Sequence, residues 1–163
     1  MTTDPAARSA PRSPARRGHI LIVSVLGLVP WSVQTFTAGA ATLLFPWGLV
    51  GPATGSVTTI TDFFLRFTMG LPDYILVWPV GVACYLVALG SALSGVLFGR
   101  EDVRLTAAGL LLAGVTQLEV ARGFSVQPGR TAWPVGTVLL WAAAGFLYWS
   151  RARLDADGSS RRA

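Results

Sequence analysis

Long, mainly uncharged apolar stretches alternate along the chain with short segments that hold most of its charges. Four such stretches cover residues 19–38, 74–98, 105–121 and 133–150. Each comes close to the roughly 20 residues with which an α-helix crosses about 30 Å of hydrocarbon. The pattern predicts an all-α fold, an integral membrane four-helix bundle formed by residues 18–150.

The two ends of the chain differ from this domain in composition. Residues 1–17 are rich in Ala, Pro, Ser and Arg and predict a disordered cytoplasmic arm, and residues 151–163 predict a cytoplasmic tail. The first apolar stretch also resembles a secretory signal, because arginines precede it and small residues follow at Thr37–Ala41. Since the apolar run continues through Pro30 and Trp31, we expect an uncleaved span, with cleavage as the alternative.

Arginine placement predicts the orientation. All thirteen basic residues are arginine, and ten of them fall in the arm, in the tail, or in the turn between the second and third stretches. Only Arg66, Arg122 and Arg130 fall at the other ends of the predicted spans. Positive residues favour the cytoplasmic side, so we expect both termini inside and a multi-pass protein of the cell membrane.

Composition agrees with a membrane protein whose first partner is the lipid bilayer. Hydrophobic residues make up 52% of the chain, charged residues only 13%, and the mean hydropathy is +0.55. A soluble domain carries about 25% charged residues. The sequence pI near 10.7 does not indicate nucleic-acid binding, because the arginines flank apolar runs and form no continuous basic face.

The outer loop over residues 39–73 contains a pattern with helical period. Five apolar residues recur on one stripe: Val57, Ile60, Phe64, Phe67 and Leu71. We expect an amphipathic helix that starts after Ser56 as N-cap and carries an ion pair between Asp62 and Arg66 on its other side. This helix is interpreted as a lid over the spans or, alternatively, as a gating element.

Only one ionisable residue lies well inside a predicted span. This residue is Glu119, with Gln117 two positions before it and Arg122 three positions after it. Charged side chains within a membrane are costly and are often functional. We therefore single out these three residues as a possible functional polar cluster. Glu119 either pairs with Arg122 near the outer end of the span or handles protons or cations in the interior.

No constellation for catalysis, cofactor binding or metal binding is found in the sequence. Cys84 and His19 are the only residues of their types, and no acidic cluster with ligand spacing accompanies them. Nucleophile, Walker and dinucleotide motifs are also absent from the sequence. These observations predict a non-enzymatic protein without cofactors.

Small residues in the second and third stretches predict close helix packing. Gly95, Gly99, Gly109 and Ala113 are the main candidates, because small side chains let helices approach closely in lipid. The contacts serve the bundle itself or, alternatively, another membrane protein or a second copy of the chain.

The tetrapeptide WPVG occurs at Trp78–Gly81 and again at Trp133–Gly136. Proline is tolerated in the first turn of a helix, and tryptophan favours the membrane–water interface. We therefore predict interface anchors in four residues: Trp78, Pro79, Trp133 and Pro134. The repeat also suggests two related helical hairpins in parallel orientation.

Several segments together resemble a family of small haloarchaeal membrane proteins without assigned function, informally labelled as lying near HtrA-type protease genes. They read LVPWS, LLFPWGLV, GLPDYILVWPV, SGVLFGRED and WPVGTVLLW. The resemblance implies no catalytic residue. We expect an accessory or scaffold subunit of a membrane or envelope complex, with a small transporter or channel that uses Glu119 as the alternative.

Overall fold

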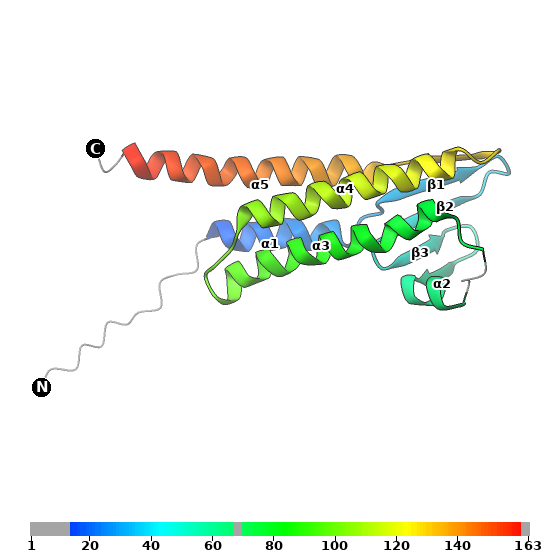
Figure 1. Ribbon diagram of the computed structural model, residues 1–163, viewed down its shortest axis with the longest axis horizontal. Coiled ribbons are helices and arrows are strands. Elements are labelled where there is room, and N and C mark those ends of the chain that lie inside the picture. Colours follow the sequence, from blue (N-terminus) through cyan, green and yellow to red (C-terminus); the bar gives the residue numbers. More distant parts are fainter. Residues whose placement is uncertain (1–13, 67–69, 161–163) are drawn as a thin grey trace, which may run out of the picture.

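A computed structural model describes residues 14–66 and 70–160. Four helices run side by side along the long axis of the molecule (Figure 1). They are α1 (Pro14–Leu26), α3 (Asp73–Leu97), α4 (Val103–Ser125) and α5 (Val135–Ser160). α3 and α4 form a tightly packed hairpin, with α1 against α3 and α5 against α4.

A five-stranded antiparallel sheet lies beside the far ends of α3 and α4 (Figure 1). Its strands are β1 (Ser32–Phe36), β2 (Ala41–Phe45), β3 (Gly48–Gly51), β4 (Ser56–Thr59) and β5 (Arg130–Trp133), in the spatial order β4-β3-β2-β1-β5. The first four strands follow one another as a meander. β5 comes from the α4–α5 connection and pairs with β1, so the sheet joins strands that are far apart in the sequence.

The prediction of an all-α four-helix bundle is therefore wrong. The first predicted span fails at its centre, because α1 ends at Leu26 and β1 begins at Ser32. Pro30, between them, has no N–H to continue a helical hydrogen-bond ladder. Beyond it, β-branched residues such as Val33 and Thr35 favour a strand.

The predicted outer loop is mostly sheet. Residues 32–59 hold four strands, and the amphipathic helix is reduced to α2 (Ile60–Arg66). Ser56 begins β4 rather than capping a helix, and Val57 is 60% exposed. The ion pair between Asp62 and Arg66 is confirmed, with Nε of Arg66 3.2 Å from Oδ1 of Asp62. Phe67 lies outside the described residues.

By length and composition, two helices of the described chain could cross a membrane, α3 and α4. α1 is apolar but has only 13 residues. The expected multi-pass bundle of four spans is thus corrected to a helical hairpin with two flanking helices and a sheet. The start of α1 and the end of α5 lie at the same end of the molecule as the α3–α4 turn (Figure 1).

The helices pack through small residues. A Cβ on Gly109 of α4 would come within 2.7 Å of the backbone oxygen of Cys84 on α3, and a Cβ on Gly81 would collide with the Thr116 side chain. Because the backbones approach so closely, larger side chains cannot fit between them. A core of mostly small and branched side chains, capped by Trp31 and Tyr85, fills the space between α1, α3, α4 and α5.

A second core holds the sheet against the helices. Leu44 of β2, Ile75 and Trp78 of α3, and Val120 of α4 are all buried there. The Trp78 ring meets the Phe63 ring of α2 at 5.8 Å between centroids. This core places one face of the sheet over the first turns of α3 and the last turns of α4.

Candidate functional site

The sheet turns a partly polar face toward the helices. In register, Ser32 pairs with Leu44, and Gln34 pairs with Thr42 on β2 and with Ala132 on β5. Residues directly opposite in an antiparallel pair share a face, and alternate residues of a strand share it as well. Ser32 and Gln34 are both buried, so this inner face brings polar groups to the helix ends.

A cavity of about 340 Å³, which we call the junction cavity, lies between this inner face, α2 and the ends of α3 and α4. Its walls come from several elements: Gln34, Thr42, Leu49, Phe63, Leu71, Pro72, Tyr74, Ile75, Phe124, Gln127 and Arg130. Apolar side chains form most of the wall, and the polar groups gather on the sheet and near the α4–β5 connection. The cavity is therefore amphipathic.

Tyr74 and Arg130 shape the polar side of the junction cavity. The Tyr74 ring rests on Gly123, where a Cβ would collide with it, and the Gln127 amide donates a hydrogen bond of 2.8 Å to its hydroxyl. The Arg130 guanidinium lies over the Phe36 ring, 5.4 Å from its centroid. Arg130 forms no salt bridge within the described residues, so its charge is open to an anion.

Buried polar atoms without partners concentrate at the junction of sheet and helices. Within residues 14–66 and 70–160 these are Ser32 Oγ, Gln34 Nε2, Trp78 Nε1 and both amide atoms of Gln117. A buried polar group without a hydrogen bond costs about 1–3 kcal/mol. Native proteins place ordered water or a ligand at such groups. The junction is thus the part of the fold where a polar ligand group would be most stabilising.

The predicted polar cluster does not form one site. Gln117 is fully buried at the junction, whereas Glu119 and Arg122 point away on the exposed side of α4. The Arg122 guanidinium donates to Glu119 at 3.3 Å, and the Glu119 side chain is 51% exposed. Glu119 therefore pairs with Arg122, one of the two alternatives that the sequence left open. Its carboxylate does not point into the space between the helices.

The two copies of WPVG occupy different environments. Trp78 is buried in the second core and Pro79 lies inside α3, whereas Trp133 is 60% exposed at the end of β5 and Pro134 precedes α5. In both copies the glycine lies where another part of the fold approaches its backbone closely. A Cβ on Gly136 would lie 2.6 Å from the Trp31 Cα, much as Gly81 meets Thr116. The anchoring role of the tryptophans and prolines stays a prediction.

Two of the four predicted packing residues lie between helices, and a third contacts the α3–α4 turn. Gly109 and Ala113 are buried on α4, and Gly95 is buried against the side chain of Glu101. Gly99 instead follows the C-cap of α3 with φ +72°, a left-handed conformation that glycine adopts without strain. Its role is to end the helix before the turn into α4.

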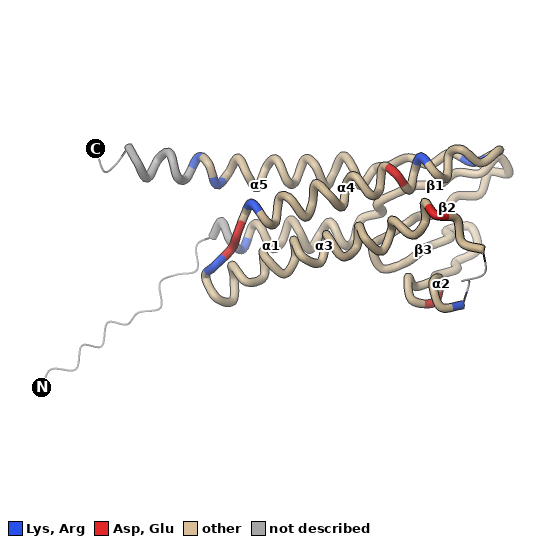
Figure 2. The backbone as a smooth tube through the Cα atoms, viewed as in Figure 1, with Lys and Arg blue, Asp and Glu red and all other residues tan. Residues whose placement is uncertain are grey.

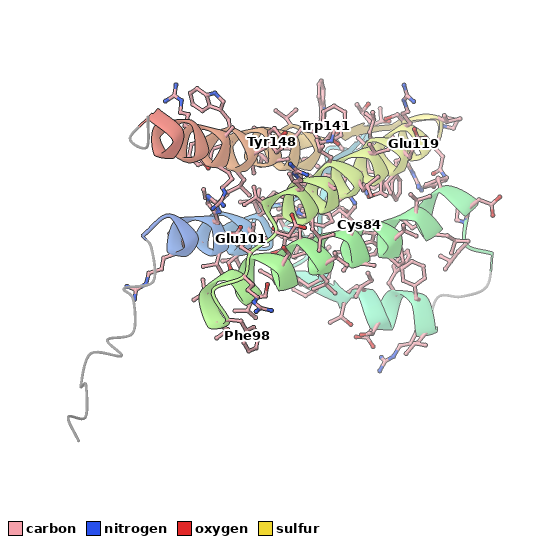
Figure 3. All side chains as sticks on the ribbon, turned by 60° about the vertical axis from the view of Figure 1, so that its left-hand side comes forward. Cys84, Phe98, Glu101, Glu119, Trp141 and Tyr148 are labelled. Carbon is pink, nitrogen blue, oxygen red and sulfur yellow. The ribbon has the colours of Figure 1, made fainter. Side chains whose placement is uncertain are left out.

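A second polar group, which we call the His19 cluster, lies at the opposite end of the helices. Nδ1 of His19 on α1 is 3.0 Å from both carboxylate oxygens of Glu101, and Nε2 is 3.2 Å from Ser150 Oγ on α5. The His19 and Glu101 side chains are only 7% and 5% exposed. Figure 3 shows Glu101 and Glu119 toward opposite ends of the helices.

The His19 cluster brings a serine, a histidine and an acid side by side. The Ser150 hydroxyl donates to the Leu147 carbonyl at 2.9 Å and contacts Nε2 of His19, while Glu101 contacts Nδ1. These buried contacts fasten α1 to the α3–α4 turn and to α5.

Sequence reasoning missed both the junction cavity and the His19 cluster. Pairing of β1 with β5 could not be read from the chain, and His19 was considered only as a metal ligand. One signal did exist: His19, Glu101 and Ser150 each stand at the predicted inner end of an apolar stretch. The described residues contain no group of three His, Cys, Asp or Glu residues that could hold a metal ion.

Comparisons with known proteins identify a family but no activity. A comparison with curated proteins found no match. A family model described as a domain of unknown function, DUF8050, matches residues 1–157. Nothing in that description bears on HtrA-type proteases, so the resemblance noted in the sequence stays a prediction. Because the match covers nearly the whole chain, the protein belongs to the DUF8050 family.

Proposed function

We propose that the protein is an integral membrane protein that inserts its helices in the bilayer, displays its sheet at one membrane surface, and serves as a non-enzymatic accessory subunit. The observation that carries this proposal is an uncharged belt around the helices. Charges border the belt at Asp73 on α3, at Arg100 in the α3–α4 turn, and at Arg104 and Glu119 on α4. Figure 2 shows the charges at the two ends of the molecule, with none along the middle of the helices.

Side chains in this belt are apolar and face outward. Of the most apolar window of α3, only 33% is buried inside the protein, compared with 56% for α4. Leu86, Val87 and Leu93 on α3 are each at least 43% exposed. A core helix of a soluble protein hides its apolar residues, whereas a helix of 25 residues, about 37 Å long, could present them to lipid.

Exposed aromatic residues gather near both borders of the belt. Trp47 and Trp133 lie at the sheet end, and Tyr148 and Trp149 lie near the opposite end of α5. The Arg153 guanidinium sits 3.4 Å from the centroid of the Trp149 ring. Tryptophan and tyrosine favour the two membrane–water interfaces, and arginine next to them can reach the headgroups.

Arginine placement supports one orientation. The arginines whose side chains are described lie mainly at the end opposite the sheet: Arg17, Arg100, Arg104, Arg151 and Arg153. Three lie at the sheet end, namely Arg66, Arg122 and Arg130. The excess favours a cytoplasmic location for the α3–α4 turn and an external location for the sheet. α1 starts at the cytoplasmic end and has only 13 residues, and residues 27–31 continue from it to β1 at the sheet end.

The accessory role rests on the sheet and its open edge. β4 is an edge strand, and Ser56, Val57 and Thr59 on it are exposed and uncharged. An exposed edge strand offers backbone hydrogen bonds to a strand of a partner protein. None of the described contacts supports the alternative of a transporter that uses Glu119, because this carboxylate is paired and exposed.

Membrane fractionation tests the proposal. Membranes of cells that produce the chain are washed with alkaline carbonate and with urea, and the pellet and supernatant are compared by immunoblot. We expect the chain to stay in the pellet under both washes and to enter the supernatant only with detergent. Release of most of the chain by carbonate alone would contradict membrane insertion.

A further inference from the structure

We propose that the junction cavity binds a single-chain amphiphile with an anionic head, such as a fatty acid or a chain that ends in a phosphate. The shape and the chemistry of the cavity carry this inference. It does not depend on membrane insertion, because the walls belong to the fold itself. The proposal adds a binding activity to the accessory role and names the chemical class of the ligand.

The apolar wall and the size of the cavity define the tail. Leu49 of the sheet, Phe63 of α2, Ile75 of α3 and Phe124 of α4 form a continuous apolar surface around it. A volume of about 340 Å³ is at the small end of ligand pockets, which span roughly 300–1,000 Å³. One acyl chain matches this space, and a two-chain phospholipid exceeds it.

The polar wall offers hydrogen-bond donors to the oxygen atoms of a ligand. Gln34 is only 4% exposed, lines the cavity, and its Nε2 has no acceptor within the described residues. The Tyr74 hydroxyl accepts from Gln127 and so keeps its own proton to donate. Gln34 on β1 and Tyr74 on α3 come from different elements and line the same cavity, as expected of a site for a head group with several acceptor oxygens.

The charge of the cavity selects an anion. Arg130 is the one charged residue among the described residues that line it, and no Asp or Glu neutralises it there. Its contact with the Phe36 ring holds the guanidinium on the inner face of the sheet without using its hydrogen-bond donors. A carboxylate or a phosphate would bind this guanidinium through charge-assisted hydrogen bonds.

Photocrosslinking tests the inference on the full-length chain, purified in a steroid detergent that has no single acyl chain to compete. The probe is a 12-carbon fatty acid with a diazirine on its tail, and adducts are mapped by mass spectrometry. We expect a saturable adduct at Leu49, Phe63 or Phe124. Arg130→Gln and Gln34→Leu should each weaken labelling about tenfold, since each removes one donor to the head.

Matched controls distinguish labelling in the junction cavity from nonspecific labelling of apolar surfaces. Arg122→Gln removes an exposed arginine at the same end of the molecule and should leave labelling unchanged. A probe of equal length that ends in an alcohol should label at least about tenfold more weakly, and one that ends in a phosphate tells which anion is preferred. Equal labelling by the alcohol would overturn the anionic head. Adducts confined to Leu86 and Leu89, which line a separate apolar groove, would overturn the site.

Discussion

Glu101 holds the imidazole of His19 with both carboxylate oxygens at 3.0 Å, although the two residues are 82 positions apart. Gly95 makes room for this contact, because a Cβ there would lie 2.5 Å from the Glu101 Cβ. Since Ser150 contacts the other ring nitrogen, one side chain joins α1, the α3–α4 turn and α5. This contact fixes the end of the fold that lies farthest from the sheet.

Removal of this carboxylate should strongly destabilise the fold. We expect Glu101→Ala to lower the free energy of unfolding by about 1–3 kcal/mol, because the buried His19 imidazole loses its hydrogen-bond partner. Glu119→Ala is the matched control, since it breaks an exposed pair that contributes at most about 1 kcal/mol. Thermal unfolding followed by circular dichroism measures both. Equal losses in the two variants would show that the contact between His19 and Glu101 does not hold the helices together.

Gly81 and Gly90 offer a matched pair on α3. A Cβ at Gly81 would collide with Thr116, whereas a Cβ at Gly90 meets nothing within 4 Å. We expect Gly81→Ala to lower the unfolding temperature, because α3 and α4 must separate to make room. Gly90→Ala should be neutral or stabilise by about 0.5–1 kcal/mol through its helix propensity. An unchanged unfolding temperature for Gly81→Ala would contradict the close packing of the hairpin.

An introduced charge tests whether lipid or water surrounds the uncharged belt of the helices. Leu86 at the middle of α3 and Val126 at the end of α4 are both exposed, at 55% and 84%. If the belt faces lipid, Leu86→Asp costs about 2.5–3.5 kcal/mol and reduces the fraction of chain recovered in membranes. Val126→Asp lies outside the belt and should not change recovery. Normal recovery and stability of Leu86→Asp would indicate that water surrounds α3.

Neutralising Glu119 should leave the protein intact. We expect Glu119→Gln to insert and fold like the unmodified chain, because the exposed Glu119–Arg122 pair contributes little. The same variant in liposomes checks the transporter alternative, with proton or cation flux as the readout. Flux in the unmodified protein that disappears in Glu119→Gln would favour transport and argue against the accessory role.

The helical half of the fold was readable from the sequence, and the sheet was not. The stretches predicted at 74–98, 105–121 and 133–150 correspond to α3, α4 and most of α5. Long uncharged runs identify these helices in the sequence. In the structure α4 also has a local cap, because the Asp102 side chain accepts from the Arg104 and Leu105 amides. Hydropathy, however, does not distinguish the apolar residues of a strand from those of a helix. The first predicted span therefore included residues of both α1 and β1.

The candidate site depends on contacts between distant parts of the chain. The neighbours of Gln34 at the junction come from β2, β5 and the ends of α3 and α4, and no local pattern predicts which strand pairs with β1. Pro30 and the β-branched residues after it gave a sign that the first span ends early. Glu119 stood out in the sequence because it is charged, but burial singles out Gln117 instead.

The most direct test of membrane insertion with the sheet outside is cysteine accessibility. Cys84 is the only native cysteine, so Cys84→Ala gives a cysteine-free background. Into it we would introduce Ala53→Cys, in the exposed β3–β4 turn, or Ala152→Cys, at the exposed end of α5. A membrane-impermeant maleimide should label A53C on intact cells and A152C only after the membrane is opened. Labelling of both cysteines on intact cells, or of neither before lysis, would contradict membrane insertion with the sheet outside.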